Sequence, residues 1–207
     1  MSAEHAHIAP FGPAGPELTF PEEVGDYVCA QYDRAERIVE YGSGGSTAYG
    51  AAQPGKAIWS VEGSKDWHAA MAAHFEAHPP KAELHLIHAD IGPTKAWSYP
   101  SNNNGWARYP DYCFGVWLRA DLVAPDLVLI DGRFRAGCFL ATLVSITKPT
   151  RVLIDDYVGR EDKYEGITQF AEPTGFHGRM AQFDLEPVES LPATALYPIL
   201  KLFQGKA

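Results

Sequence analysis

The sequence predicts an α/β protein built on a doubly wound, mostly parallel seven-stranded sheet, with helices on both faces and a C-terminal antiparallel β-hairpin. Three observations predict this fold. Strand-like and helix-like segments alternate along most of the chain, two strand-like segments are almost entirely apolar, and a glycine-rich turn joins the first strand to a helix. Near-continuous apolar strands are typical of a sheet that helices cover on both faces.

The elements follow from periodicity and from helix start and stop signals. Thr19 and Ser64 are the expected N-caps of the first and third helices, and Pro54-Gly55 and Pro79-Pro80 end the second and third. We expect strands over residues 37–41, 57–61, 83–88, 126–130, 151–154, 178–185 and 195–203, the last two paired antiparallel. We expect helices over residues 19–32, 46–53, 64–77, 112–121, 134–147 and 161–170, and a long loop over residues 91–110.

Length and composition bound the function. The 207 residues suit a single domain over residues 19–207, and the proline- and glycine-rich residues 1–18 predict a flexible leader. The formal net charge of −9 argues against a surface that neutralises many phosphates. The sequence contains no run of about 18 apolar residues that could span a membrane. The N-terminus does not resemble a secretory signal, and three cysteines without a C-x-x-C pair give no disulfide framework. We therefore expect a cytoplasmic protein without a nucleic-acid or membrane partner.

The glycine turn points to a ligand. The first predicted strand runs into Glu40-Tyr-Gly-Ser-Gly-Gly-Ser-Thr47, and a helix follows. In open α/β sheets, such a turn lies at the carboxyl edge of the strands, where ligands bind. Gly42 and Gly44 allow a tight turn and close approach of a ligand. Glu62 closes the second strand 20 residues after Gly42, where an acid can accept both hydroxyls of an adenosine ribose.

The acid before the turn separates two cofactor classes. Nicotinamide-binding turns read G-x-G-x-x-G, but the third glycine position is Thr47 in this sequence. Glu40 would also repel a pyrophosphate. An acid suits a cationic ligand better, such as one that carries an ammonium and a sulfonium.

Residues 20–205 resemble the class I S-adenosylmethionine-dependent methyltransferases. The segment from Glu40 to Ser46 resembles their first motif, E/D-x-G-x-G-x-G, with Ser46 in place of the last glycine. Glu62 falls where the family carries its ribose-binding acid, and Asp90 falls where it often carries an Asp near the adenine amine. The resemblance implies S-adenosylmethionine as cofactor, held by Glu40, Gly42, Ser43, Gly44, Glu62, Gly63, Asp90 and Asp131.

Three further acids end the fourth and fifth strands. Asp131 follows one apolar strand and Asp155-Asp156 the next, so neighbouring strands would bring three carboxylates together. Such a cluster is costly unless a cation neutralises it, and hard oxygen ligands suit Mg²⁺. The pattern resembles metal-dependent small-molecule O-methyltransferases of the catechol and macrolide-sugar types, which implies Asp131, Asp155 and Asp156 as Mg²⁺ ligands. Arg133 and Arg135 could neutralise the same acids instead, and both interpretations stay open.

The remaining candidates concern the methyl acceptor. His88 lies near the sheet edge and is a candidate general base, and with Asp131 and Asp155 it forms the predicted catalytic set. Arg133, Trp97 and Tyr157 are candidate substrate contacts. The loop over residues 91–110, with Trp97, Tyr99 and Trp106, would be either a binding loop or a loop packed on its own aromatics, and it leaves room for a homodimer.

Together these features predict an S-adenosylmethionine-dependent methyltransferase that acts on a small molecule, at oxygen. Two alternatives remain: a catalytically inactive cofactor-binding domain of the same fold, and a nicotinamide-dependent oxidoreductase, against which Glu40 and Thr47 argue.

Overall fold

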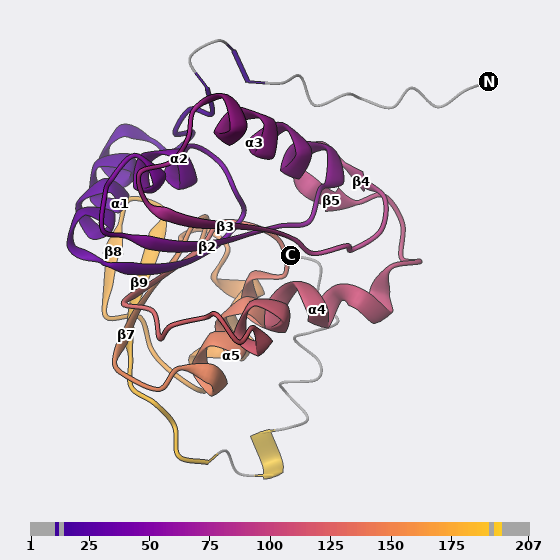
Figure 1. The fold of residues 1–207 in the computed structure, drawn as a ribbon. Helices are drawn as coiled ribbons and strands as arrows, with labels where there is room; N and C mark the ends of the chain where they lie inside the picture. Colours follow the sequence, from indigo (N-terminus) through magenta and orange to yellow (C-terminus); the bar gives the residue numbers. More distant parts are fainter. Residues whose placement is uncertain (1–10, 13–14, 191–192, 196–207) are drawn as a thin grey trace.

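The fold was derived from a computed structural model, which describes residues 11–12, 15–190 and 193–195. Its main sheet has seven strands in the order β3-β2-β1-β6-β7-β9-β8, and the arrangement is shown in Figure 1. The strands are β1 (Arg37–Tyr41), β2 (Ala57–Glu62), β3 (Glu83–His88), β6 (Leu127–Ile130), β7 (Thr150–Ile154), β8 (Gly175–His177) and β9 (Met180–Leu185). The first five are parallel, and β9 runs antiparallel to both β7 and β8. The predicted fold class is thereby confirmed.

Helices cover both faces of this sheet. They are α1 (Glu22–Arg34), α2 (Gly45–Ala51), α3 (Lys65–Ala77), α4 (Tyr109–Phe114), α5 (Arg135–Ser145) and α6 (Glu165–Thr168). Figure 1 shows α4 and α5 on one side of the sheet and α2 and α3 on the other. Among the described residues, no helix is both long and apolar enough to span a membrane.

The strands alternate between two apolar cores, one on each face. Val39, Val128 and Val152 pack with residues of α4 and α5, such as Tyr112 and Phe139. On the opposite face, their strand neighbours, including Ile38, Leu127 and Leu153, pack with Val24, Val28 and Tyr32 of α1. Because both faces are buried, the central strands need apolar residues at successive positions, which is the pattern that the sequence displays.

The ends of several helices differ from the prediction. The first helix begins at Glu22 with Pro21 at its N-cap, and Thr19 has no capping role. Pro21 lies just before the first helical residue, where its missing backbone N–H costs the helix no hydrogen bond. The predicted helix over 112–121 is α4 followed by a 3₁₀ turn, Gly115–Leu118, and the predicted helix over 161–170 is reduced to a 3₁₀ turn, Glu161–Lys163, and the single turn α6.

The C-terminal hairpin exists, but its partner strand was predicted wrongly. The strand expected over 178–185 is β9, and it pairs with β8 through the two-residue loop Gly178-Arg179. Gly178 has a φ of +54° in that loop, which suits a two-residue hairpin connection. Ala195 lies in a 3₁₀ turn, Ala193–Ala195, and the rest of the strand predicted over 195–203 lies outside the described residues.

The strand order reverses beside β1, which lies between β2 and β6. At its carboxyl end the Gly42 amide donates to the Val61 carbonyl at 2.8 Å, and the Asp131 amide donates to the Tyr41 carbonyl at 3.0 Å. Gly42 has a φ of +98°, and a Cβ on it would lie 2.9 Å from the Gly132 Cα. Two glycine backbones therefore touch at the point where open α/β sheets form their ligand crevice.

This contact can be tested by Gly42→Ala with Gly55→Ala as a matched control. Gly55 also has a positive φ, +82°, but a Cβ there would meet no atom within 4 Å. Both variants should lose about 1–2 kcal/mol of unfolding free energy to backbone strain. Gly42→Ala should lose a further ~1–3 kcal/mol from overpacking against Gly132, measured by urea unfolding. Equal losses in the two variants would contradict the close packing.

Candidate functional site

A buried carboxylate supports the glycine turn. Glu40 has no exposed surface. Its Oε2 accepts hydrogen bonds from the hydroxyls of Thr47 at 2.5 Å and Ser60 at 3.0 Å, and its Oε1 accepts one from Ser46. Burial raises the pKa of Glu40, and these hydroxyls oppose the rise because they stabilise the charged form. Thr47 also accepts the Gly44 amide at 2.9 Å. The carboxylate thus binds the turn itself rather than facing solvent.

The turn is open on one side and covered on the other. A Cβ on Gly44 would meet no atom within 4 Å, whereas one on Gly45 would overlap the backbone of Glu17. The Ser43 carbonyl accepts the indole N–H of Trp67 in α3 at 2.7 Å, and its hydroxyl lies 2.7 Å from that of Ser60. A ligand can therefore approach the backbone of this turn at Gly44.

The described part of the predicted leader forms a wall of the site. The Phe11 ring packs edge-on against Trp67 and His74 of α3, with centroids 5.4 and 5.5 Å apart. Gly15 is buried, and a Cβ on it would lie 2.6 Å from the His74 ring. From there the chain reaches Glu17 and the glycine turn.

Glu62 lies beside the turn, at the end of β2, and is 3% exposed. Its Oε1 accepts the Ser64 amide at 2.7 Å and the Ser98 hydroxyl at 2.7 Å. Burial raises the pKa of Glu62, and the Ser64 and Ser98 hydrogen bonds counteract that rise. The Ser98 hydroxyl therefore already occupies an oxygen that was predicted to accept a ribose hydroxyl.

The loop that carries Ser98 has an unusual backbone. It includes the short strands β4 (Thr94–Lys95) and β5 (Tyr99–Pro100), which pair antiparallel around a 3₁₀ turn, Ala96–Ser98. Trp97 and Ser98 have φ values of +61° and +55°, in the left-handed region that side chains disfavour. The Trp97 side chain is 74% exposed. The loop therefore turns its serine toward Glu62 and its tryptophan toward solvent at a conformational cost.

Gly63 directly follows Glu62 in the chain, and Asp90 follows β3, the strand that pairs with β2. Asp90 is exposed, its Oδ1 accepts the Gly92 amide at 2.9 Å, and its Oδ2 pairs with Arg108. A Cβ on Gly63 would lie 2.7 Å from the Ile91 Cδ1, so the backbone of Gly63 is packed against the loop after β3. Their predicted contacts with a cofactor stay predictions.

The acids after β6 and β7 meet arginines. Arg179 from the β8–β9 loop binds both oxygens of the buried Asp155, Nε to Oδ1 at 2.9 Å and Nη2 to Oδ2 at 2.7 Å. Asp156 lies 3.1 Å from Arg160, 3.3 Å from Arg179 and 3.5 Å from Arg135. Two-pronged arginine–carboxylate pairs are among the stronger ionic contacts in proteins.

Asp131 stands between this network and the glycine turn. Burial, together with the neighbouring Asp155 carboxylate, raises the pKa of Asp131 to about 8, although the Arg135 guanidinium opposes the shift. Arg135 Nη2 lies 3.5 Å from Asp131 Oδ1, and the same guanidinium donates to the carbonyls of Gly132 at 3.1 Å and Asp155 at 2.9 Å. Asp131 is therefore mostly protonated near neutral pH.

The predicted Mg²⁺ site does not fit this donor set. Asp155 is bound by Arg179 and Asp156 contacts three arginines, whereas Mg²⁺ requires carboxylate oxygens that are free to coordinate it. Among the described residues, no group of three His, Cys, Asp or Glu side chains could hold a metal ion. Arginine neutralisation, the alternative that the sequence left open, is the arrangement observed. Arg135 takes part as considered, and Arg160 and Arg179 join it.

The remaining predicted residues are scattered. His88 of β3 pairs in register with Glu62 of β2. It also lies beside His68 of α3, with ring centroids 5.5 Å apart. Burial, and then His68, lowers its pKa. Three strand spacings, about 14 Å, separate β3 from β6, so the structure does not bring His88 to Asp131 or Asp155. Tyr157 is 3% exposed and stacks on Tyr164, which places it in the wall behind the acids.

Arg133 lies at the crevice but pairs with no acid among the described residues. It is 8% exposed, and its guanidinium carbon lies 4.0 Å from the centroid of the Tyr99 ring. Burial raises the pKa of Tyr99, but the charge and hydrogen bond of Arg133, together with the charges of Arg135 and Lys163, lower the pKa below its ordinary value. Arg133 therefore stacks on the aromatic loop rather than neutralising Asp131.

Comparison with known proteins places the chain in a family. No family model matches the sequence, and no curated protein matches it. A solved structure of a methyltransferase-like protein from Silicibacter pomeroyi DSS-3 is 40% identical, with a TM-score of 0.85 over 91% of this chain and 97% of that one. The chain belongs to the class I S-adenosylmethionine-dependent methyltransferase family.

More distant solved structures share the fold alone. A putative O-methyltransferase from Klebsiella pneumoniae is 17% identical, with a TM-score of 0.54 over 82% of this chain and 83% of that one. A putative rRNA-methylase from Clostridium thermocellum is 8% identical, with a TM-score of 0.53 over 83% and 100%. The family assignment thus rests on the 40% identical protein.

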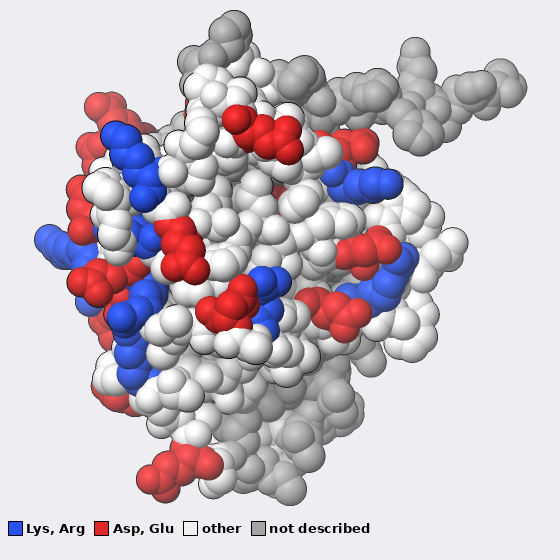
Figure 2. Space-filling model, viewed as in Figure 1, with Lys and Arg blue, Asp and Glu red and all other residues white. Residues whose placement is uncertain are grey.

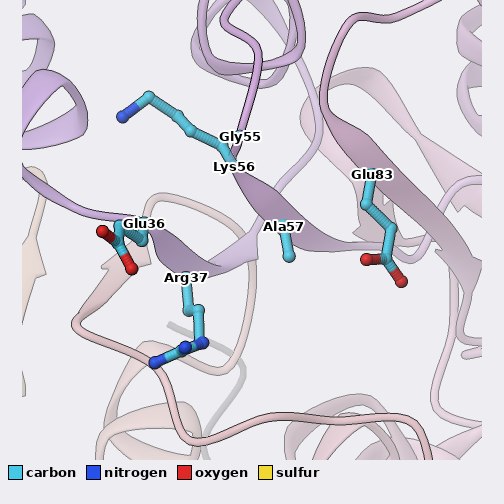
Figure 3. Close-up of a pocket in the computed structure, with 6 residues that line it drawn as sticks. All are labelled: Glu36, Arg37, Gly55, Lys56, Ala57 and Glu83. Carbon is cyan, nitrogen blue, oxygen red and sulfur yellow. The ribbon is translucent and has the colours of Figure 1, made fainter.

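A pocket at the opposite edge of the sheet is not the family's site. It measures about 280 Å³ and lies at the amino ends of β1, β2 and β3. Figure 3 shows its lining residues: Glu36, Arg37, Gly55, Lys56, Ala57 and Glu83. Parallel sheets bind ligands at their carboxyl edge, which in this structure is bordered by the Ser98 loop, Arg133 and the leader.

Sequence reasoning missed Arg179, Ser98 and the hydroxyls that bind Glu40. The Gly178-Arg179 pair between two strand-like segments was a hairpin signal that would have placed Arg179 at a turn. Ser46 and Thr47 were noted only as departures from glycine motifs, although hydroxyls beside a buried acid are natural partners. Nothing local marks Ser98, because its contact with Glu62 spans 36 residues.

The Asp131 proton gives a stability that depends on pH. Because the folded pKa of about 8 lies above the ordinary value of 3.8, the folded state binds this proton more tightly than the unfolded state. The contribution of Asp131 to stability is full below pH 4 and falls as the pH rises to about 8, by at most about 1.4 kcal/mol per pH unit. Asp131→Asn should therefore gain stability relative to the wild type between pH 5 and 8, measured by urea unfolding. A difference that is constant with pH would contradict this assignment.

Proposed function

We propose that the chain is an S-adenosylmethionine-dependent methyltransferase that acts on a small-molecule acceptor, with transfer to oxygen. One observation carries the proposal: the open glycine turn at Gly44 lies beside the buried Glu62, at the reversal point of the sheet, in a member of this family. The two features suit the two ends of such a cofactor, because the turn admits an amino-acid group and the carboxylate accepts ribose hydroxyls.

The cofactor would supply an electrophilic methyl group on a sulfonium. Gly42, Ser43 and Gly44 would contact its amino-acid portion through their backbone, and Glu62 would accept ribose hydrogen bonds. Glu40 would act at one remove, since its carboxylate fixes Ser46 and Thr47 and so the shape of the turn. The chain's main contribution would be to hold the methyl group and the acceptor in line.

Transfer to oxygen is supported by Asp131. A hydroxyl acceptor must lose its proton, and the ionised fraction of a carboxyl group whose pKa lies near the working pH can accept it. Asp131 lies at the end of β6 beside the glycine turn, with a pKa raised to about 8. Asp155 would support this exchange, because it is the neighbouring carboxylate that helps to raise the pKa of Asp131, while Arg179 holds Asp155 in place.

A small acceptor also agrees with the surface. On the face shown in Figure 2, acidic and basic side chains of the described residues are interspersed, without the broad basic patch that a nucleic acid would need. Trp97 and Trp106, 74% and 70% exposed, are the aromatic residues that an acceptor or a second copy of the chain would cover. The homodimer and the cytoplasmic location stay predictions.

A nicotinamide cofactor is disfavoured by one specific contact. Thr47, at the third glycine position of the nicotinamide motif, uses its hydroxyl to bind Glu40 directly beneath the turn. A pyrophosphate would therefore approach a turn that has a carboxyl group behind it. The second alternative, an inactive domain that binds the cofactor, differs from the proposed enzyme only in lacking methyl transfer. Conversion of S-adenosylmethionine to S-adenosylhomocysteine in the presence of an acceptor would distinguish the two.

Calorimetric titration tests the cofactor assignment. The wild type should bind S-adenosylhomocysteine and should not bind NAD⁺. Glu62→Gln should weaken that binding by at least about tenfold, since hydrogen bonds to a charged group contribute roughly 1.5–3 kcal/mol. Glu83→Gln is the matched control, because Glu83 lies at the amino end of β3, at the edge of the sheet opposite Glu62. This variant should bind like the wild type. Absence of heat with S-adenosylhomocysteine, or binding of NAD⁺ in its place, would refute the assignment.

Ser98 gives a second test, in which the affinity for S-adenosylhomocysteine should rise rather than fall. Its hydroxyl must leave Glu62 Oε1 before that oxygen can accept a ribose hydroxyl, so Ser98→Ala should bind S-adenosylhomocysteine several-fold more tightly. The same variant should melt at a lower temperature without ligand, because it loses a half-buried hydrogen bond to a carboxylate. Ser101→Ala, an exposed serine of the same loop, is the control for both measurements. Weaker binding by Ser98→Ala would show that Ser98 belongs to the bound site instead.

A further inference from the structure

Arg133 is a buried cation that lacks a compensating anion among the described residues. It is 8% exposed, and its Nε is buried without a hydrogen-bond partner. Its neighbours in the network are all paired, since Arg135, Arg160 and Arg179 each contact Asp131, Asp155 or Asp156. Arg133 instead rests on the Tyr99 ring, 4.0 Å from its centroid.

This arrangement is unfavourable for a protein without ligand. Removing a guanidinium from water costs more than contact with one aromatic ring returns, and buried charges are normally paired with an opposite charge. The lowered pKa of Tyr99 points the same way, because the unpaired charge of Arg133 favours a negative group beside it. An incoming anion would complete the site.

The position of Arg133 limits what that anion can be. The residue follows Gly132, whose backbone touches Gly42 of the glycine turn. Tyr99 follows Ser98, which binds Glu62. Arg133 therefore stands between the proposed ribose acid and the acid–arginine network, where a cofactor's amino-acid end and an acceptor would meet.

We propose that Arg133, held on the ring of Tyr99, is a binding subsite for the carboxylate of a ligand in this crevice. A guanidinium presents two parallel N–H donors that match the two oxygens of a carboxylate. The carboxylate belongs either to the amino-acid end of the cofactor or to the acceptor. This subsite rests on the proposed function only for the identity of the cofactor.

The variant Arg133→Met separates a ligand role from a structural one. It replaces an unpaired buried charge with an apolar side chain of similar length, so its melting temperature without ligand should equal or exceed that of the wild type. Arg135→Met is the matched control, and it should melt well below the wild type because Arg135 is paired with Asp131 and Asp156. A loss in Arg133→Met as large as that in Arg135→Met would overturn the proposal.

Calorimetry tests whether the cofactor is the source of the carboxylate that Arg133 binds. S-Adenosylhomocysteine carries the amino-acid carboxylate, and 5′-methylthioadenosine lacks it. If the cofactor supplies the carboxylate, Arg133→Met should bind S-adenosylhomocysteine at least about tenfold more weakly and 5′-methylthioadenosine unchanged. Arg133→Lys, which keeps the charge, should recover part of the affinity.

Melting temperatures measured with small carboxylates and amides test whether the acceptor is the source of the carboxylate instead. In that case Arg133→Met should bind S-adenosylhomocysteine like the wild type. Acetate and benzoate should raise the melting temperature of the wild type more than acetamide and benzamide, and this preference should vanish in Arg133→Met. Unchanged cofactor affinity together with no preference for carboxylates over amides would overturn the subsite. The series is also run without S-adenosylhomocysteine, so a failure of the proposed function would leave the carboxylate preference measurable.

Discussion

The buried carboxylate of Glu40 is the interaction on which the site depends. It lies at the end of β1 and accepts hydroxyls from Ser46 and Thr47 of α2 and from Ser60 of β2. A carboxylate so deeply buried is tolerated only when its oxygens are hydrogen-bonded, so these three elements must meet in one register. That register leaves Gly44 facing open space and places Gly42 against Gly132, which together form the crevice at the sheet reversal.

Two kinds of chemistry stabilise the acids along this edge. On the β1–β2 side, Glu40 and Glu62 are buried, which raises their pKa values, and hydrogen bonds from neutral donors oppose that rise. On the β6–β7 side, Asp155 and Asp156 are neutralised by arginines from three separate segments. Asp131 lies at the boundary and keeps its proton. The edge can therefore hold many acids without a metal, because each one has a partner suited to its surroundings.

The sequence predicted the features that depend on local patterns. The central strands and the glycine turn were identified correctly, because burial on both faces and a tight turn each leave a mark on adjacent residues. Charge pairing leaves no such mark. Arg179 meets Asp155 across 24 residues, so the chain alone could not choose between a metal and arginines for the acids.

The same limit explains the other errors. The partner of β9 is decided by a two-residue loop, and the competing segment over 195–203 carries an equally strand-like pattern. His88 and Asp131 both end strands, but sheet order sets them about 14 Å apart, and that order is a property of the whole fold. Arg133 was expected at the crevice, but its stacking on Tyr99 depends on a loop 34 residues earlier.

The contact between Gly45 and Glu17 makes the residue type at one position depend on the path of a distant segment of the chain. A Cβ at position 45 would meet backbone atoms, which cannot rotate away as a side chain can. While the leader follows this path, position 45 has no alternative to glycine. A relative with a larger residue there must route its N-terminal segment elsewhere, so the amino acid at this one position serves as a marker for how each relative covers its glycine turn.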